Sequence, residues 1–296
     1  MLGCERKAET PGNDSATVLT PPALEAHDSV VVTASWRDRD GPFLVTATDE
    51  ARVVSLVTPD STAMRDGEAI VRLKRSATQQ IVLIGRGGVI ARATVRPSTL
   101  VQRHGCEWPR ATLATSDSLG EDVRWGVGFA GAVAEPVAVD SLERLTRGDS
   151  ARLVADLARM ASALPDDSSA AFRGIPFVVR NAWRFEPAPG AMALVAEISR
   201  RVAQEANQRE ERLLLVAERD TTAARWQPRW WTRAQGTEET VETLDALALV
   251  RLAGDVWPSL VVGHDAPAGA WQEIVARSAT GAWRRRWRSG VSGGCS

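Results

Sequence analysis

The chain contains no tyrosine, and it has only three histidines, three cysteines and two lysines. The histidines and cysteines lack the paired spacing of a zinc site, so we expect no metal ion or cofactor. No apolar run reaches the length of about eighteen residues that a transmembrane helix needs. Neither sign of charge dominates, because 36 Lys and Arg nearly cancel 37 Asp and Glu. This balance excludes a strongly basic nucleic-acid coat protein and a strongly acidic disordered chain. The 44% of hydrophobic residues and the 11 tryptophans instead indicate an ordinary globular protein with a sizeable core.

The first folded part of the chain has the pattern of a small β domain. Short segments rich in Val, Ile, Leu and Thr alternate with turn signals such as Asp40-Gly41-Pro42 and Gly85-Arg86-Gly87-Gly88. We expect strands at 29–36, 43–48, 52–58, 68–74, 80–85 and 89–96. Pro97 ends this series, so the sequence predicts a β barrel or sandwich over residues 28–98.

The remaining residues, 99–296, predict a larger antiparallel β-meander domain with one amphipathic helix. The helix is expected at 150–164, with Asp149 as N-cap and Pro165 as its stop. Strands are expected at 124–130, 136–140, 176–185, 192–202, 213–219, 229–234, 239–252, 259–264, 271–277 and 282–289. The segment 192–202 also fits a helix, and that alternative stays open. The fold class is therefore mainly β, and α+β overall.

The N-terminal residues Met1-Leu2-Gly3-Cys4 resemble the end of a bacterial lipobox. The resemblance implies that Cys4 is lipidated after a signal peptide is cleaved, and that the protein is exported and membrane-anchored. The basic and apolar stretches of a signal peptide are missing, and a start codon further upstream would explain this. Glu5, which follows the cysteine, implies sorting to the outer membrane, with the protein facing the periplasm or the cell surface. Residues 1–27 are rich in Pro, Ser, Thr, Ala and charge, as expected of a flexible tether.

Lipidation of Cys4 leaves Cys106 and Cys295 as an even pair in an oxidising compartment. We expect them to form a disulfide that holds the C-terminal end of the chain. Two unrelated free thiols are the alternative, and they are expected if the protein is cytoplasmic.

The segment Trp283-Arg284-Arg285-Arg286-Trp287-Arg288 is the most distinctive local pattern. On a regular strand Trp283, Arg285 and Trp287 share one face, where they form a candidate contact for a polar or anionic envelope ligand. The structural alternative places both tryptophans in the core, with arginines paired to acids or stacked on aromatic rings at the surface. Neutral net charge and export argue against nucleic acid as the partner.

Other motifs favour ordinary structural roles. Asp38-Arg39-Asp40-Gly41 is half of a calcium loop without the downstream acid, so a hairpin turn is favoured. His264-Asp265 has the composition of a general base, but no nucleophile motif accompanies it. The acid pair at 238–239 is expected at the solvated surface. Residues 242–295 resemble a blade of the calcium-loop propellers without the acidic loop ligands.

Taken together, the sequence predicts an exported, membrane-anchored lipoprotein of the cell envelope with a non-catalytic binding or scaffolding role. Its partners are then the membrane, through the lipid, and an envelope protein or polar envelope ligand. A secreted hydrolase with acidic catalytic residues from distant strands is one alternative, and a pocket lined by acids with raised pKa values would favour it. A cytoplasmic β-rich binding protein is the other alternative.

Overall fold

The computed structural model describes residues 43–47, 52–55, 80–103, 106–115, 125–130, 134–165, 170–202, 208–220 and 225–288. The tether and the strands expected at 29–36 and 68–74 lie outside these residues. The described chain is mainly β with one α-helix, which confirms the predicted fold class. No helix within the described ranges is long and apolar enough to span a membrane.

Six antiparallel strands form a closed barrel in the order β1-β2-β5-β4-β3-β6, and β6 pairs with β1 to complete the ring. They are β1 (Phe43–Ala47), β2 (Arg52–Ser55), β3 (Gln80–Gly85), β4 (Gly88–Arg103), β5 (Cys106–Thr115) and β6 (Trp125–Ala130). Pro97 does not end the unit, because the β4–β5 register shifts between Arg96 and Thr99. An irregularity of this kind accommodates a proline inside a strand. The boundary expected at residue 98 therefore falls within β4, and the barrel continues to Ala130.

Two five-stranded antiparallel sheets follow, which we call the helix-side sheet (order β12-β11-β10-β9-β8) and the barrel-side sheet (order β16-β15-β14-β13-β7). The helix-side sheet joins consecutive strands, as expected for a meander, and the barrel-side sheet does so from β13 to β16, with β7 paired to β13. The helix-side sheet contains β8 (Asp140–Ser141), β9 (Val178–Ala188), β10 (Ala191–Val202), β11 (Arg209–Asp220) and β12 (Gln227–Thr237). The barrel-side sheet contains β7 (Ala134–Pro136), β13 (Thr243–Leu252), β14 (Ser259–Ala266), β15 (Gly269–Arg277) and β16 (Trp283–Arg288). The segment 192–202 is thus a strand and not a helix.

The predicted helix is α2 (Arg147–Ser162), flanked by the short 3₁₀ turns η3 (Leu142–Arg144) and η4 (Ala170–Phe172). It begins earlier than expected because Thr146, and not Asp149, is the N-cap. The Thr146 side chain accepts a hydrogen bond from the Asp149 backbone N–H at 3.2 Å, and its hydroxyl donates to the Asp149 carboxylate at 2.8 Å. The buried side chains Leu153, Leu157 and Ala161 form the expected apolar face.

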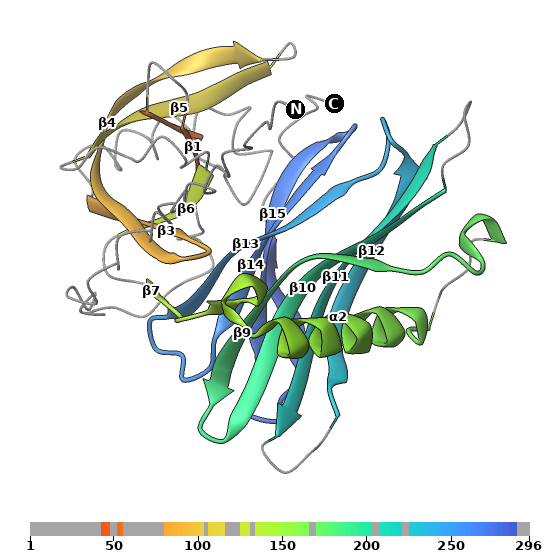
Figure 1. Cartoon of the computed structure of the whole chain (residues 1–296). Helices are drawn as coiled ribbons and strands as arrows, with labels where there is room; N and C mark the ends of the chain where they lie inside the picture. The colour runs from red at the N-terminus through yellow and green to blue at the C-terminus, as the bar shows by residue number, and fades with distance from the viewer. Residues whose placement is uncertain are drawn as a thin grey trace, which may run out of the picture.

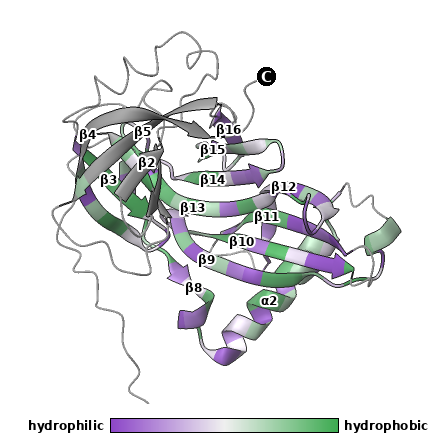
Figure 2. Cartoon of the chain, turned by 90° about the horizontal axis from the view of Figure 1, so that it is seen from above, coloured by the Kyte–Doolittle hydropathy of each residue, from purple (hydrophilic) through white to green (hydrophobic). Residues whose placement is uncertain are grey.

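The barrel, the two sheets and α2 are stacked as successive layers (Figure 1), and each contact between layers is an apolar core. Val82, Ile84, Val127 and Phe129 of the barrel pack on the barrel-side sheet. A second core fills the space between the sheets, and a third lies between the helix-side sheet and α2. Figure 2, turned by 90°, likewise places the barrel beside β13 and α2 beside β9. The barrel-side sheet is therefore covered on both faces.

A β-bulge in β13 lets this strand serve two cores. Leu244 and Ala246 belong to the core between the sheets, whereas Leu247 and Ala248 both belong to the core against the barrel. The pairing with β14 skips Leu247, which is the extra residue of the bulge. The strand therefore changes its alternation at Leu247, close to the polar site described next.

Candidate functional site

The space between the two sheets is apolar in its middle and polar at both ends, and only one of these ends forms a groove. Along β10, Ala193 and Val195 face this space, and the same face continues with Glu197, Ser199 and Arg201. On β11 the same change occurs, where Leu214 and Val216 give way to charged residues. Both strands thus carry polar side chains out of the core toward the open end of the sandwich.

These side chains line a groove of about 340 Å³, which we call the junction groove. Its lining residues come from β9, β10 and β11 of the helix-side sheet and from β13 of the barrel-side sheet. They are Arg180, Glu197, Ile198, Ser199, Arg201, Glu210, Arg212, Leu213, Thr243, Leu244 and Asp245.

Glu197 is the central side chain of the groove, because groups from all three β units donate hydrogen bonds to it. One carboxylate oxygen accepts from Arg86 Nη2 at 3.0 Å and from the Ala246 backbone N–H at 3.0 Å. The other accepts from Asn181 Nδ2 at 2.6 Å. Three donors offset part of the cost of burying this carboxylate, which thus holds the barrel and both sheets together at one point.

Arg86 reaches this point from the turn between β3 and β4, the hairpin predicted from its glycines. Its Nε donates to the Ala246 carbonyl at 2.7 Å, and its guanidinium lies 4.8 Å from the ring centroid of Trp183. Strand β7 pairs only with residues 250–252 of β13, so no strand among the described residues lies beside Ala246 on that edge. Arg86 and Glu197 bind its carbonyl and amide groups instead, and they close an edge that a further strand would otherwise pair with.

Burial raises the pKa of both Glu197 and Asp245 above their ordinary values of 4.5 and 3.8. The Arg86 guanidinium opposes this effect at both groups and lies 3.8 Å from the Asp245 carboxylate. Asp265 adds a smaller repulsion that raises the pKa of Asp245 further. The groove therefore holds two carboxyl groups that accept protons more readily than exposed ones.

Three arginines line the groove on the helix-side sheet. Arg201 and Arg212 each lie 3.3 Å from the buried Glu210 carboxylate, and Arg212 Nη1 donates to the Thr243 hydroxyl at 2.5 Å. Arg180 Nε donates to the Ser199 hydroxyl at 2.8 Å. One acid is thus shared by two guanidinium groups, and the third arginine is held by a neutral side chain.

Trp283, Arg285 and Trp287 do not lie on one face of β16, contrary to the prediction. The pairing of β15 with β16 skips Arg286, so the alternation of the strand is shifted there. Trp283 belongs to the core between the sheets and Trp287 to the core against the barrel, and both are buried. Arg285 is exposed and lies 3.4 Å from Glu273, as the structural alternative predicted.

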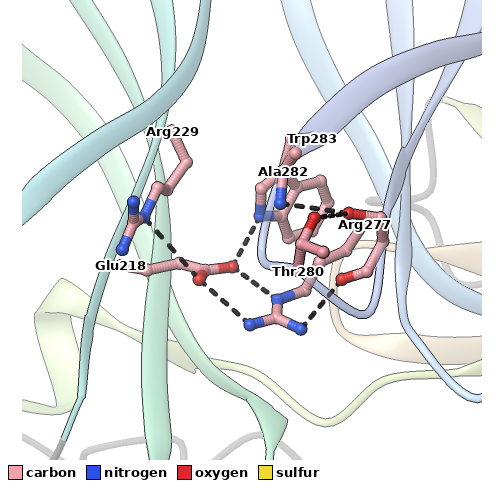
Figure 3. A network of polar contacts seen from close by, with 7 residues as sticks. Glu218, Arg229, Arg277, Thr280, Ala282 and Trp283 are labelled. Atoms are coloured by element: carbon pink, nitrogen blue, oxygen red, sulfur yellow. Dashed lines mark hydrogen bonds and ion pairs between the residues drawn. The ribbon is translucent and has the colours of Figure 1, made fainter.

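Trp283 belongs to a buried polar cluster at the other end of the sandwich (Figure 3). Its indole N–H donates to Glu218 Oε1 at 2.6 Å, and Arg277 donates to both oxygens of the same carboxylate, at 2.7 and 3.2 Å. Glu218 comes from β11, and its two hydrogen-bond donors come from β15 and β16, whereas Arg229 of β12 lies 3.9 Å from its carboxylate. This cluster, the Glu218 clamp, therefore joins the two sheets.

His264 is buried near the junction groove and is held between two acids. Its Nδ1 contacts the Glu242 carboxylate, and its Nε2 lies 3.8 Å from Glu273. Its ring stacks on Trp271 with centroids 4.8 Å apart. Cross-strand pairing places it opposite Leu244, a lining residue of the groove. The arrangement fixes the ring in the sheet.

The remaining predicted residues have separate outcomes. Cys4 and Cys295 lie outside the described residues, as does the motif at 38–41. Cys106 begins β5, but the structure does not describe its side chain, so the disulfide between Cys106 and Cys295 stays a prediction. The acid pair at 238–239 is exposed, as expected. Within the described ranges, no group of three or more His, Cys, Asp or Glu side chains is placed to hold a metal ion.

The sequence reasoning did not identify Arg86, Glu197, Arg212 or Asp245. A signal for Glu197 was present, because the face of β10 that carries Ala193 and Val195 becomes polar from Glu197 onward. Nothing in the sequence shows that Asp245 and Arg86, far away along the chain, meet this face.

Comparison with known protein families, with curated protein sequences and with solved structures finds no match to this chain. The function must therefore be argued from the chemistry of the site.

Proposed function

We propose that this protein is an exported, membrane-anchored envelope protein that binds a small polar ligand in the junction groove without transforming it. The observation that carries the proposal is the groove itself, which gathers charged side chains of both signs where the barrel and the two sheets meet. Its volume of about 340 Å³ suits a small ligand. Pockets for apolar ligands have mostly apolar linings, whereas charges dominate here.

A binding role is favoured over catalysis by the way Glu197 is held. A general acid must release its proton, and a nucleophile must present a free oxygen to the substrate. Both oxygens of Glu197 accept hydrogen bonds from Arg86, Asn181 and the Ala246 backbone. The carboxylate is thus committed to holding the layers together and shaping the groove.

The binding role is tested by ligand-observed NMR with a panel of neutral, cationic and anionic polar compounds of a few hundred daltons. We expect at least one class to bind the wild-type protein. Its signal should weaken in the double variant Arg180→Gln/Asp245→Asn, which changes both walls of the groove. Arg152→Gln, an exposed arginine on α2, is the matched control and should bind as the wild type does. If no class binds, or if the double variant binds equally well, the groove is not the ligand site and the proposal fails.

Anchoring is proposed from Cys4 and the tether that follows it, with the outer membrane as its destination and the lipid as its contact with the membrane. The test is palmitate labelling of the protein expressed from its own gene, compared with Cys4→Ser. We expect label and membrane association in the wild type only. A soluble, unlabelled wild-type protein would support the cytoplasmic alternative. Alkylation before and after reduction, read by mass spectrometry, tests the bridge proposed between Cys106 and Cys295.

Hydrolysis is the second candidate, because Glu197 and Asp245 both have a raised pKa and both lie within ion-pair distance of Arg86. Paired carboxyl groups with perturbed pKa values are typical of acid–base hydrolases. Asp245 is the acid that is free to act, because its side chain is 40% exposed. Release of nitrophenol from a panel of nitrophenyl glycosides and esters by the wild type, and its loss in Asp245→Asn, would favour this candidate over the binding role.

A further inference from the structure

We propose that the ligand of the junction groove is a small hydroxylated anion, such as a sugar acid or a sugar phosphate. This inference rests on the binding role proposed above and adds the chemical class of the ligand. Three observations carry it: unused hydrogen-bond donors on one wall, an unused acceptor on the other wall, and the size of the groove.

The donor wall belongs to the helix-side sheet. Arg180 uses only its Nε, toward Ser199, and Arg201 uses only Nη2, toward Glu210. Within the described part of the chain, their other guanidinium N–H groups make no hydrogen bond. Arg180 occupies the position that the β9–β10 register skips between Asn181 and Val179. A bulge changes the direction of a side chain, which here becomes part of the groove lining.

The charge on this wall favours an anion. Glu210 is buried and neutralises part of the charge of Arg201 and Arg212. Glu197 is compensated by Arg86, which comes from the barrel. Arg180 carries a charge that no acid of the described chain balances within ion-pair distance. The planar fork of a guanidinium group matches the two oxygens of a carboxylate or a phosphate, so an anionic group fits between Arg180 and Arg201.

The acceptor wall belongs to β13 of the barrel-side sheet. Asp245 lies 3.8 Å from Arg86, and no hydrogen-bond donor within the described residues reaches its carboxylate. A ligand hydroxyl can donate to it. Cationic ligands fit the groove less well, because they would face the three arginines. A groove with donors on one wall and an acceptor on the other therefore matches an anion that also carries hydroxyl groups.

The size of the groove limits the ligand to about one sugar ring with its charged substituent. Its volume of about 340 Å³ is at the low end for ligand pockets.

Isothermal titration calorimetry of the purified protein tests the proposed ligand class with five probes: glucuronate, glucose 6-phosphate, glucose, glucosamine and inorganic phosphate. We expect glucuronate or glucose 6-phosphate to bind at least about tenfold more tightly than glucose, because the charge-assisted contacts are lost with the neutral sugar. The stronger of the two acids identifies a carboxylate or a phosphate as the anionic group. Glucosamine is expected not to bind.

Variants separate the two walls. Arg180→Gln and Arg201→Gln should each weaken binding of the preferred acid about tenfold, whereas Arg152→Gln should leave it unchanged. Asp245→Asn should weaken binding of the hydroxylated acid and leave inorganic phosphate binding unchanged. Circular dichroism confirms that each variant is folded.

The inference is overturned if glucose or glucosamine binds as tightly as the acids, or if the acids bind equally to the arginine variants. It is also overturned if neither acid binds. If a neutral or cationic compound of the NMR panel nevertheless binds in the groove, the proposed binding role stands and only the ligand class is wrong. If no compound of the panel binds, the binding role itself fails.

Discussion

The Glu218 clamp allows a quantitative test of how the two sheets are joined. Glu218 is 4% exposed, and it accepts hydrogen bonds from Arg277 and from the Trp283 indole. Replacing it by glutamine keeps the volume of the side chain but removes its charge and one carboxylate oxygen. The Arg277 side chain, which is 9% exposed, then keeps a buried charge without its main counter-ion.

Breaking a buried ion pair from one side typically costs about 3–5 kcal/mol, because the remaining charge stays desolvated. We therefore expect Glu218→Gln to lower the free energy of unfolding by about 3–5 kcal/mol. The double variant Glu218→Leu/Arg277→Met removes both buried charges and should lose less than Glu218→Gln alone, because Arg229, the other arginine near Glu218, is 41% exposed and stays solvated.

Urea unfolding followed by tryptophan fluorescence is the assay. Seven of the 11 tryptophans lie after residue 225, so the signal comes mainly from the two sheets. At a typical urea dependence, the expected loss lowers the midpoint by about 1–2 M. A loss below about 1 kcal/mol in Glu218→Gln, or a larger loss in the double variant, would show that the clamp does not stabilise the contact between the sheets.

Three further predictions concern the rest of the fold. Arg86→Gln and Glu197→Gln should each lower the free energy of unfolding measured in urea. Because both substitutions break the same ion pair, the loss in the double variant should be smaller than the sum of the two single losses, by about 0.5–3 kcal/mol. Burial raises the pKa of Asp245, so its folded form binds protons more tightly than the unfolded chain does. Its contribution to the stability of the wild-type protein therefore falls as the pH rises from 3.8 through its raised pKa. In this pH window, Asp245→Asn should flatten the dependence of the free energy of unfolding on pH. If the slope of that dependence is unchanged in the variant, burial does not raise the pKa of Asp245. Gly236→Ala should cost about 1–3 kcal/mol in thermal unfolding, because a β-carbon there would lie 2.8 Å from a backbone nitrogen, whereas Gly148→Ala in α2 meets no atom within 4 Å and should not destabilise.

Local patterns predicted most elements of the fold because a half-buried strand or helix must repeat its apolar residues at a fixed period. Strand β3 matches its predicted range, and α2 differs only at its ends, where Thr146 replaces Asp149 as the cap. The errors occur at irregular positions. Pro97 lies inside β4, and the bulge at Arg286 separates the two tryptophans of β16. Such positions change the direction of a side chain without changing the composition of the strand.

The sequence by itself determined the mainly β class, most of the individual strands and the amphipathic helix, because each depends on periodicity within a single segment. Only the tertiary structure decided that the barrel extends to β6 and packs on the barrel-side sheet, and that Arg86, Glu197 and Asp245 meet. Arg86 and Glu197, for example, are 111 positions apart along the chain. The burial of whole sheet faces decides which strands lie side by side, and the sequence of a single segment does not show which other segment will cover its apolar face.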